Sequence, residues 1–235
     1  MGNVILAINT STPQFSVALV YENGALLAEW TLFPGTKNFR PFMTVLDHLL
    51  QVSGVDLAEI RALVVAKGPG SFTGLRVGVS VAKGICEGLT LPIVALSSLE
   101  ALAGQCPFQR YPICPVIDSR KGEVFAALYT WSGHEDLQIL EPETCLEIKE
   151  LPYFIKNRAF VIGTDFDRQM RPIASALEDR AVFAPPSFWN IRASTLGMLG
   201  ARRASAGRFD SLREMVPSYL RPPDIRPNPY NVSKS

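Results

Sequence analysis

The stretch from Lys67 to Thr90 decides the fold of this chain, and it reads K-G-P-G-S-F-T-G-L-R-V-G-V-S-V-A-K-G-I-C-E-G-L-T. The apolar run at 62–66 just before it is typical of a buried strand. A Gly-Pro-Gly turn and a capping hydroxyl at Ser71 or Thr73 then predict a helix that runs to Thr90. One face of this helix is apolar and suited to packing on a sheet: Leu75, Val79, Ala82, Cys86 and Leu89.

A second face of the same helix carries small residues. Its members are Gly74, Val77, Val81, Gly84 and Gly88, and Gly78 is a fourth glycine inside the helix. Each interior glycine costs a helix roughly 1 kcal/mol relative to alanine, so the four together cost about 3–4 kcal/mol. Such a face lets another backbone approach closely, either a neighbouring helix of the same domain or a helix of a second subunit. We favour a subunit interface, because the apolar face already supplies the contact with the helix's own sheet.

The residues around this helix predict alternating strands and helices. Strands are expected at 3–9, 15–21 and 25–33, and Asn23-Gly24 is a strong hairpin signal between the last two. An amphipathic helix at 38–53 precedes the strand at 62–66. A short strand at 93–96 and a helix from about residue 97 follow the glycine-bearing helix and complete the first half.

The sequence pattern predicts that the second half repeats the order of elements of the first. Ile8-Asn9-Thr10 aligns with Ile117-Asp118-Ser119, and Ala18-Leu19 aligns with Ala127-Leu128 without a gap. Further strands are expected at 137–145 and 159–163, and helices at 165–177 and 190–206. We therefore predict an α/β protein with two duplicated domains, 1–105 and 106–220, and a disordered proline-rich tail at 221–235. Two such units facing each other form a cleft, which is a natural nucleotide site.

Composition and charge narrow the class of protein. The 235 residues include 23 basic and 22 acidic side chains, a formal net charge of +1, which argues against direct nucleic-acid binding as the main activity. Residues 192–235 hold eight basic and three acidic residues, which we interpret as a solvated helix end and a loose tail. No apolar run approaches the roughly 18–20 residues that span a bilayer, and no signal peptide is apparent. The four cysteines lack C-x-x-C spacing and indicate reduced thiols, so we expect a cytoplasmic protein.

Residues that carry chemistry in enzymes are sparse. The two histidines, His48 and His134, lack the spacing of metal ligands, and Ser71 is not part of a G-x-S-x-G motif. The loop at 68–74 resembles a phosphate cradle before a helix, but it lacks the G-x-x-x-x-G-K-[ST] arrangement. Metal-dependent hydrolysis and nucleophilic catalysis are therefore disfavoured.

Two turns place Asn or Asp directly before a hydroxyl residue, at Asn9-Thr10 and at Asp118-Ser119. They indicate a nucleotide cleft that lacks a convincing set of catalytic residues. In a duplicated phosphotransferase, the first turn would carry an aspartate that holds hydrated Mg²⁺, but neutral Asn9 stands there. Asp118 remains in the second turn, followed by Arg120 and Lys121, and a single carboxylate supports phosphoryl transfer poorly. We expect no catalytic residue and no metal site. The predicted degenerate cleft consists of Asn9, Thr10, Ser11, Asp118 and Gly163.

Four motifs carry a family resemblance across almost the whole chain. They are I-L-A-I-N-T-S-T at 5–12, G-P-G-S-F-T-G-L-R at 68–76, D-S-R-K-G-E-V-F at 118–125 and P-S-Y-L-R at 217–221. With these motifs the chain resembles the TsaB (YeaZ) family, bacterial proteins required for making threonylcarbamoyladenosine in tRNA. The resemblance implies an actin-like or Hsp70-like ATPase (ASKHA) fold, in which two ribonuclease-H-like domains hold mixed sheets flanked by helices.

The resemblance also implies a non-catalytic role beside TsaD, the subunit that transfers the threonylcarbamoyl group to the adenosine next to the anticodon. Implied partners are TsaD, the ATPase TsaE and a second copy of the chain, with tRNA reached only through the complex and no membrane. No cofactor is expected for the chain alone, although ATP or ADP with Mg²⁺ at a subunit junction is one option. The helices at 73–90 and 38–53 match the family's pairing surface, which gives the predicted interface: Gly74, Val77, Gly78, Val81, Gly84, Ile85, Gly88, Phe42 and Leu46.

This chain departs from the family pattern in two places. Asn9 stands where the family commonly has aspartate, and Asn38-Phe39-Arg40 replaces a frequent H-S-E at the start of the first helix. Both changes weaken any remaining metal or nucleotide role. The alternative function, an M22-type glycoprotease or a nucleotide hydrolase, is disfavoured because the chain has two histidines, whereas an intact ligand pair in that helix would have supported it.

Overall fold

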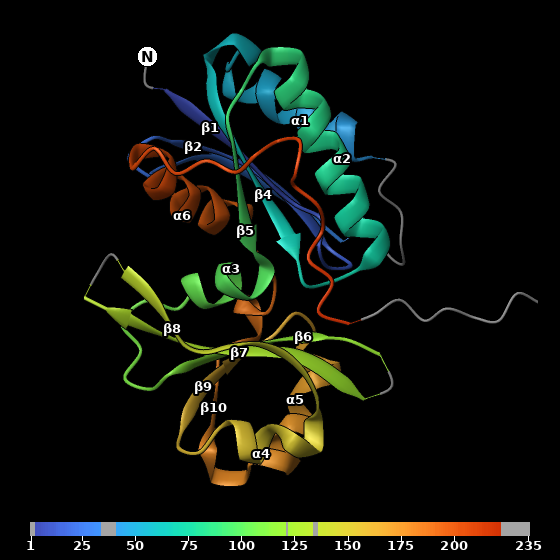
Figure 1. Cartoon of the computed structure of the whole chain (residues 1–235), viewed down its shortest axis with the longest axis vertical. Helices are drawn as coiled ribbons and strands as arrows, with labels where there is room; N and C mark the ends of the chain where they lie inside the picture. The colour runs from blue at the N-terminus through green and yellow to red at the C-terminus, as the bar shows by residue number, and fades with distance from the viewer. Residues whose placement is uncertain (1–2, 34–40, 121, 134–135, 222–235) are drawn as a thin grey trace, which may run out of the picture.

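The structure is a computed structural model, and it describes residues 3–33, 41–120, 122–133 and 136–221. Two five-stranded sheets lie one above the other along the long axis of the molecule (Figure 1). The predictions for Asn38-Phe39-Arg40, Lys121, His134 and most of the tail (222–235) lie outside the described residues.

The first sheet has the strand order β3-β2-β1-β4-β5. Its strands are β1 (Val4–Asn9), β2 (Phe15–Tyr21), β3 (Leu26–Leu32), β4 (Ile60–Gly68) and β5 (Ile93–Ser97). Strands β1, β2 and β3 are antiparallel neighbours, whereas β4 and β5 run parallel to β1. Every residue of β1 is buried, as expected for a strand that is apolar on both faces.

The second sheet repeats this topology, with the order β10-β9-β6-β7-β8. Its strands are β6 (Ile113–Asp118), β7 (Glu123–Ser132), β8 (Asp136–Glu147), β9 (Ala159–Ile162) and β10 (Ala181–Phe183). The predicted duplication and the α/β fold class are thereby confirmed. The ungapped alignment was wrong by one position, because Asn9 pairs with Ser16 whereas Asp118 pairs with Val124, so the second turn is one residue shorter.

Helices cover both outer faces and fill the space between the sheets. The α-helices are α1 (Phe42–Ser53), α2 (Phe72–Leu89), α3 (Ser98–Gly104), α4 (Leu151–Phe154), α5 (Phe166–Leu177) and α6 (Ala193–Ser205). Short 3-10 helices lie at Leu57–Glu59, Ile148–Glu150, Glu178–Arg180 and Pro186–Phe188. Helices α1 and α2 pack on the outer face of the first sheet and α4 and α5 on that of the second, while α3 and α6 lie between the sheets (Figure 1).

The last helix corrects the predicted boundary of the second domain. Helix α6 falls in the predicted domain 106–220, but it packs on β1, β2 and β4 of the first sheet. The approach is close because a Cβ on Gly197 would meet Val20 and Ala7, and a Cβ on Gly200 would meet Val64. Helix α3 contacts β6 and β7 of the second sheet as well as β4 and β5 of its own sheet. The third helix of each half therefore lies between the sheets and contacts the sheet of the other half.

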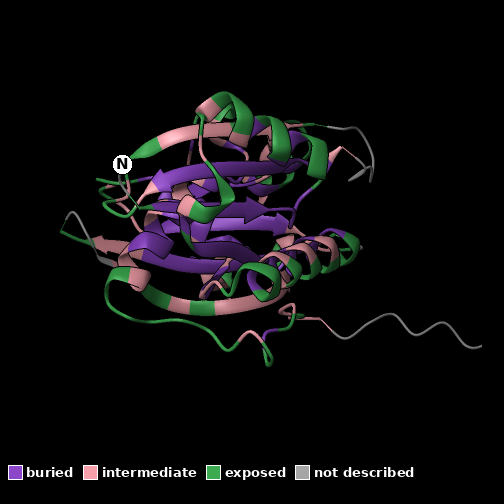
Figure 2. Ribbon diagram, turned by 90° about the horizontal axis from the view of Figure 1, so that it is seen from above, coloured by how far each residue is buried: buried purple, intermediate pink, exposed green. Residues whose placement is uncertain are grey.

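Three hydrophobic clusters stabilise this arrangement. One fills the space between the sheets around α3 and α6, one lies under α1 and α2, and one lies under α4 and α5. Figure 2 shows the buried strands as an inner layer with exposed residues on the surrounding helices and loops. Cys86, Cys106 and Cys114 are buried and all four cysteines are free, and burial raises the pKa of the Cys86 thiol to about 11. Among the described helices, none combines the length and apolar character needed to cross a bilayer.

Candidate functional site

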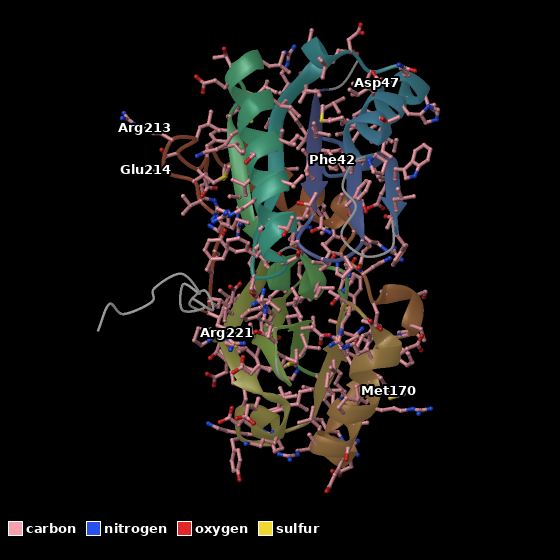
Figure 3. All side chains as sticks on the ribbon, turned by 90° about the vertical axis from the view of Figure 1, so that its right-hand side faces the viewer. Phe42, Asp47, Met170, Arg213, Glu214 and Arg221 are labelled. Atoms are coloured by element: carbon pink, nitrogen blue, oxygen red, sulfur yellow. The ribbon has the colours of Figure 1, made fainter. Side chains whose placement is uncertain are left out.

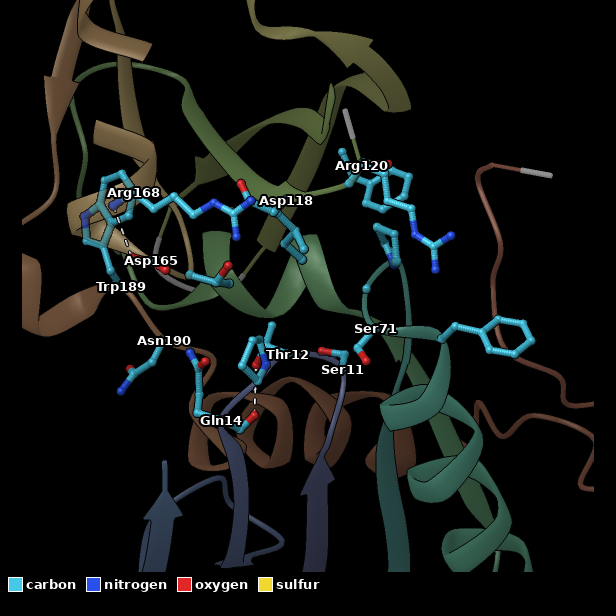
Figure 4. A pocket seen from close by; sticks show the side chains of 18 of the residues that line it. Ser11, Thr12, Gln14, Ser71, Asp118, Arg120, Asp165, Arg168, Trp189 and Asn190 are labelled. Atoms are coloured by element: carbon cyan, nitrogen blue, oxygen red, sulfur yellow. Dashed lines mark hydrogen bonds and ion pairs between the residues drawn. The ribbon is translucent and has the colours of Figure 1, made fainter. Parts of the chain in front are cut away.

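A cleft of about 1000 Å³ opens between the two sheets (Figure 4). The segments at the ends of β1, β4, β6 and β9 line it with residues 11–14, 69–73, 118–120, 164–166 and 168. Residues 186–187, 189–190 and 218–221 close its sides. Because the two sheets have equivalent topology, the carboxyl ends of corresponding strands face each other across this space. The cleft lies where the duplication predicted it.

The polar side chains of the first turn, residues 9–11, form hydrogen bonds within the protein. Asn9 is fully buried, and its Oδ1 accepts hydrogen bonds from the backbone N–H of Ser11 at 3.1 Å and from Ser11 Oγ at 2.7 Å. Thr10 Oγ1 donates to the carbonyl of Gly74 at 2.7 Å. The structure therefore places Asn9 and Thr10 beneath the cleft rather than on its wall, and of the three predicted residues in this turn the lining includes Ser11.

The second polar turn holds a carboxylate whose two oxygens are both engaged. Asp118 Oδ1 accepts a hydrogen bond from Gln169 Nε2 at 2.7 Å, and Asp118 Oδ2 lies 3.4 Å from Arg168 Nε. Gln169 in turn accepts hydrogen bonds from the N–H groups of Thr164 and Asp165. No group of three or more His, Cys, Asp or Glu side chains placed to hold a metal occurs among the described residues. This arrangement ties β6 to the loop before α5 and leaves Asp118 little capacity for Mg²⁺.

Gly163 lies against residues that sequence reasoning missed. A Cβ at this position would meet Gln169 Oε1 and the ring of Trp189. Trp189 is buried, donates from Nε1 to the carbonyl of Ala184 at 3.0 Å and packs edge-to-face on Phe166. The space beside Gly163 is therefore filled by the protein's own tryptophan. Nothing in the sequence pattern distinguishes this residue from an ordinary core aromatic.

The Gly-Pro-Gly turn joins α2 to the first polar turn. Ser71 donates from its backbone N–H to the carbonyl of Ser11 at 2.7 Å, and its side chain caps α2 by accepting from the N–H of Gly74 at 3.3 Å. Gly70 has a φ of +156°, and a Cβ there would collide with the carbonyl of Ser11. The predicted cap is thus Ser71, and the first turn of α2 is held at the edge of the cleft.

The P-S-Y-L-R motif forms part of a C-terminal strap, residues 208–221, that connects the two sheets. Ser218 donates from its backbone N–H to the carbonyl of Lys67 at 2.7 Å, which fixes the strap to the end of β4. The ring of Tyr219 lies 5.2 Å from that of Phe72 on α2. Arg221 Nη1 forms an ion pair with Glu123 Oε2 on β7 at 2.6 Å. The motif therefore bridges the units beside the cleft.

The predicted partner surface divides into buried and accessible residues. Gly74 and Gly78 are buried, and a Cβ on Gly78 would meet Thr10. Val77, Val81 and Ile85 are half-buried, and Gly84 and Gly88 are exposed, with nothing within 4 Å of an added Cβ at either glycine. We call the last five residues the α2 ridge.

The prediction that Phe42 and Leu46 of α1 belong to the partner interface is wrong, because both side chains are buried. Their exposed fractions are 1% and 3%, because the face of α1 that carries them packs on the first sheet, where Phe42 meets Phe15 edge-to-face. Figure 3 shows Phe42 between α1 and the first sheet. The apolar residues that α1 does expose are Met43 and Val52. The sequence pattern had identified the buried face of this helix and not its outer face.

Comparisons with known proteins agree on one group of relatives. The family model "TsaD: tRNA N6-adenosine threonylcarbamoyltransferase" matches residues 39–179. The "tRNA threonylcarbamoyladenosine biosynthesis protein TsaB" of Bacillus subtilis (strain 168) is 30% identical over 220 residues, covering 92% of this chain and 93% of that protein. The protein of the same name from Escherichia coli (strain K12) is 38% identical over 148 residues, covering 59% and 63%.

Solved structures agree with the predicted fold. "YeaZ from Pseudomonas aeruginosa" superposes with a TM-score of 0.79 at 24% identity, covering 94% of this chain and 100% of that one. The fold alone is shared with the Lmo2764 protein from Listeria monocytogenes, at a TM-score of 0.51 and 9% identity. Two mixed five-stranded sheets flanked by helices thus form the actin-like ATPase (ASKHA) fold.

Proposed function

The chain belongs to the TsaB (YeaZ) family, and on this premise we propose that it is a non-catalytic subunit that pairs with TsaD through the α2 ridge and supports threonylcarbamoyladenosine modification of tRNA. The family places it in threonylcarbamoyladenosine biosynthesis. In our proposal TsaE joins the pair, tRNA is met only within the complex, and the assembly works in the cytoplasm. ATP or ADP with Mg²⁺, if required, would bind at a subunit junction rather than to this chain alone.

The observation that carries the proposal is the pair of open glycines on α2. Gly84 and Gly88 have no neighbour within 4 Å of an added Cβ, so the described chain gives no packing reason for them. Each costs the helix roughly 1 kcal/mol relative to alanine. Gly74 and Gly78 differ, because they lie against the first polar turn. A second helix resting on the ridge would explain why side chains are absent at the two exposed positions.

TsaD is a fitting partner because the chain resembles it. The TsaD family model covers α1, α2 and most of the second unit of this chain, so the two proteins share the elements that carry the ridge. Related chains can pair through equivalent helices about a pseudo-twofold axis, as identical subunits do about a true one. A homodimer through the same ridge is therefore the competing assembly, and the two cannot form at once.

The cleft supports the non-catalytic part of the proposal. Asp118, the one carboxylate in the two polar turns, is bound by Arg168 and Gln169. His48 lies on α1, where its ring meets that of Trp30 at 5.1 Å, and it does not line the cleft. A glycoprotease or nucleotide hydrolase would require a different set of groups around a reacting atom.

Reconstitution with TsaD tests this function. We expect the chain to co-purify with TsaD, and we expect tRNA modification by TsaD and TsaE to require it. The chain alone should hydrolyse neither ATP nor peptides above background. An Asp118→Asn variant should support modification as well as the wild type does, because the carboxylate has no catalytic task.

Two results would count against the proposal. One is modification by TsaD that proceeds equally well without the chain. The other is ATP or peptide turnover by the purified chain that co-elutes with it and disappears in Asp118→Asn, which would favour the hydrolase alternative.

A further inference from the structure

The cleft contains a buried amide whose nitrogen has no hydrogen-bond partner. Gln14 precedes β2 and is 2% exposed, and its Nε2 has no partner among the residues that the structure describes. Figure 4 shows its amide pointing from the first sheet into the cleft, toward the second unit. Buried amides are nearly always hydrogen-bonded, so an orphan of this kind requires an explanation. The amide is placed to donate to a molecule that enters the cleft.

Asn190 presents a second unsatisfied group on the same lining. Its Oδ1 is buried and has no partner within the described part of the chain. Asn190 and Gln14 both line the cleft, and they come from different segments. A ligand that satisfies both accepts one hydrogen bond and donates another, as an amide, ureido or hydroxyl-bearing molecule does.

The N-terminus of α2 gives the cleft an electropositive wall. This helix has 18 residues, and Ser71, Phe72 and Thr73 at its start line the cleft. Its first turn, described in full, contains no acidic residue. The aligned peptide dipoles and the N–H groups of a first turn attract anions. Negative charge on a ligand would therefore be favoured at this end of the cleft.

The charged side chains of the lining do not oppose a bound anion. Arg120, Arg168 and Arg221 line the cleft beside Asp118 and Asp165, with Arg168 paired to Asp118 and Arg221 paired to Glu123 outside the lining. Both carboxylates have partners within the protein. Asp118 pairs with Arg168, and Asp165 caps α5 by accepting a hydrogen bond from the backbone N–H of Arg168. Partial positive charge from α2 is thus not cancelled by a free carboxylate in the described lining.

We propose that this cleft binds a small organic anion, whose carboxylate or phosphate lies at the first turn of α2 and whose polar body is hydrogen-bonded by Gln14. The first turn of α2 and the Gln14 side chain lie at the two ends of the short segment 11–14. The backbone N–H of Ser71 donates to the carbonyl of Ser11 at one end, and the Thr12 hydroxyl donates to the carbonyl of Gln14 at the other. A volume of about 1000 Å³ is ample for a metabolite of this size. This site is separate from the α2 ridge and does not depend on pairing with TsaD.

Three variants test the site with the full chain. Thr73→Asp puts a negative charge in the first turn of α2, where it favours the helix and competes with a bound anion. Gln14→Met removes the donor while keeping the size and burial of the side chain, and it should fold because an orphaned amide is replaced by an apolar group. Ser80→Asp is the control, since it adds the same charge to an exposed position in the middle of the same helix.

The probes are inorganic phosphate, AMP and N-carbamoylthreonine, titrated at constant ionic strength by calorimetry and by NMR. We expect at least one probe to bind the wild type, with a Kd raised about 10-fold or more by Thr73→Asp and by Gln14→Met. Ser80→Asp should change that Kd less than about 2-fold. Thermal unfolding of each variant would show that the loss of binding is not a loss of folding.

The identity of the binding probe distinguishes the sources of the anion. If AMP or phosphate binds more tightly than N-carbamoylthreonine, and Thr73→Asp and Gln14→Met weaken that binding, the ligand carries a phosphate. If N-carbamoylthreonine binds more tightly than the other two probes and the same variants weaken its binding, the ligand carries a carboxylate. Absence of binding by all three probes at millimolar concentration would overturn the proposal. Binding that Thr73→Asp and Gln14→Met leave unchanged would also overturn it, because it would show an adventitious ion only.

Discussion

Replacing Gly84 by leucine should weaken the pairing of this chain with TsaD by about 100-fold, or about 2.7 kcal/mol, while the isolated chain remains folded. Gly84 is exposed, and an added Cβ there has no neighbour within 4 Å, so a larger side chain meets nothing in its own chain. In the proposed pair the same side chain would occupy the space taken by the partner helix. Interfaces packed as densely as protein interiors tolerate such an insertion poorly.

The measurement is sedimentation of the variant alone and with TsaD, beside thermal unfolding of the monomer. Gly84→Ala is the matched control, because it should stabilise the isolated chain by up to about 1 kcal/mol through helix propensity and disturb pairing less than leucine. Association of Gly84→Leu equal to that of the wild type would remove the ridge from the partner surface.

Replacing Gly200 by alanine should destabilise the folded chain by about 2–3 kcal/mol. A Cβ at this position would meet three side-chain carbons of Val64 on β4, two of them closer than 3.0 Å. Valine is branched at Cβ and cannot rotate out of the way without disturbing the sheet. Helix α6 would have to move away from the first sheet, and its packing on β1, β2 and β4 would be lost.

Urea unfolding measures this effect, with Ser205→Ala as the control because Ser205 is exposed on the same helix. We expect the control to change the free energy of unfolding by less than about 0.5 kcal/mol. A stability of Gly200→Ala within that range would mean that α6 does not approach β4 as closely as described.

The periodicity of the sequence was sufficient to predict most of the fold. The apolar run at 4–9, the Asn23-Gly24 hairpin and the glycine-bearing helix all lie where the pattern indicated, within one or two residues. The duplication was also detectable, since Asn9 and Asp118 end equivalent strands. Such local signals are strong because each follows from the alternation of a strand or the period of a helix. The short elements α4 and β10 have too few residues to show a period, and they were missed.

Tertiary placement could not be predicted from the same patterns. The residues of α6 specify an apolar helix but not which sheet it covers, so its return to the first sheet was unexpected. The four glycines of α2 look alike in sequence, yet Thr10 lies against Gly78 while Gly84 faces open space. Gln169 and Trp189 shape the cleft from positions whose side chains have no recognisable spacing relative to Asp118 or Gly163.

Amide hydrogen exchange of the chain with and without TsaD tests the central claim most directly. If the α2 ridge is the pairing surface, exchange across residues 77–88 should slow when TsaD is added, and Gly84→Leu should show no such protection at the same concentrations. Unchanged exchange in 77–88, with protection appearing instead around the cleft or the second sheet, would contradict the account.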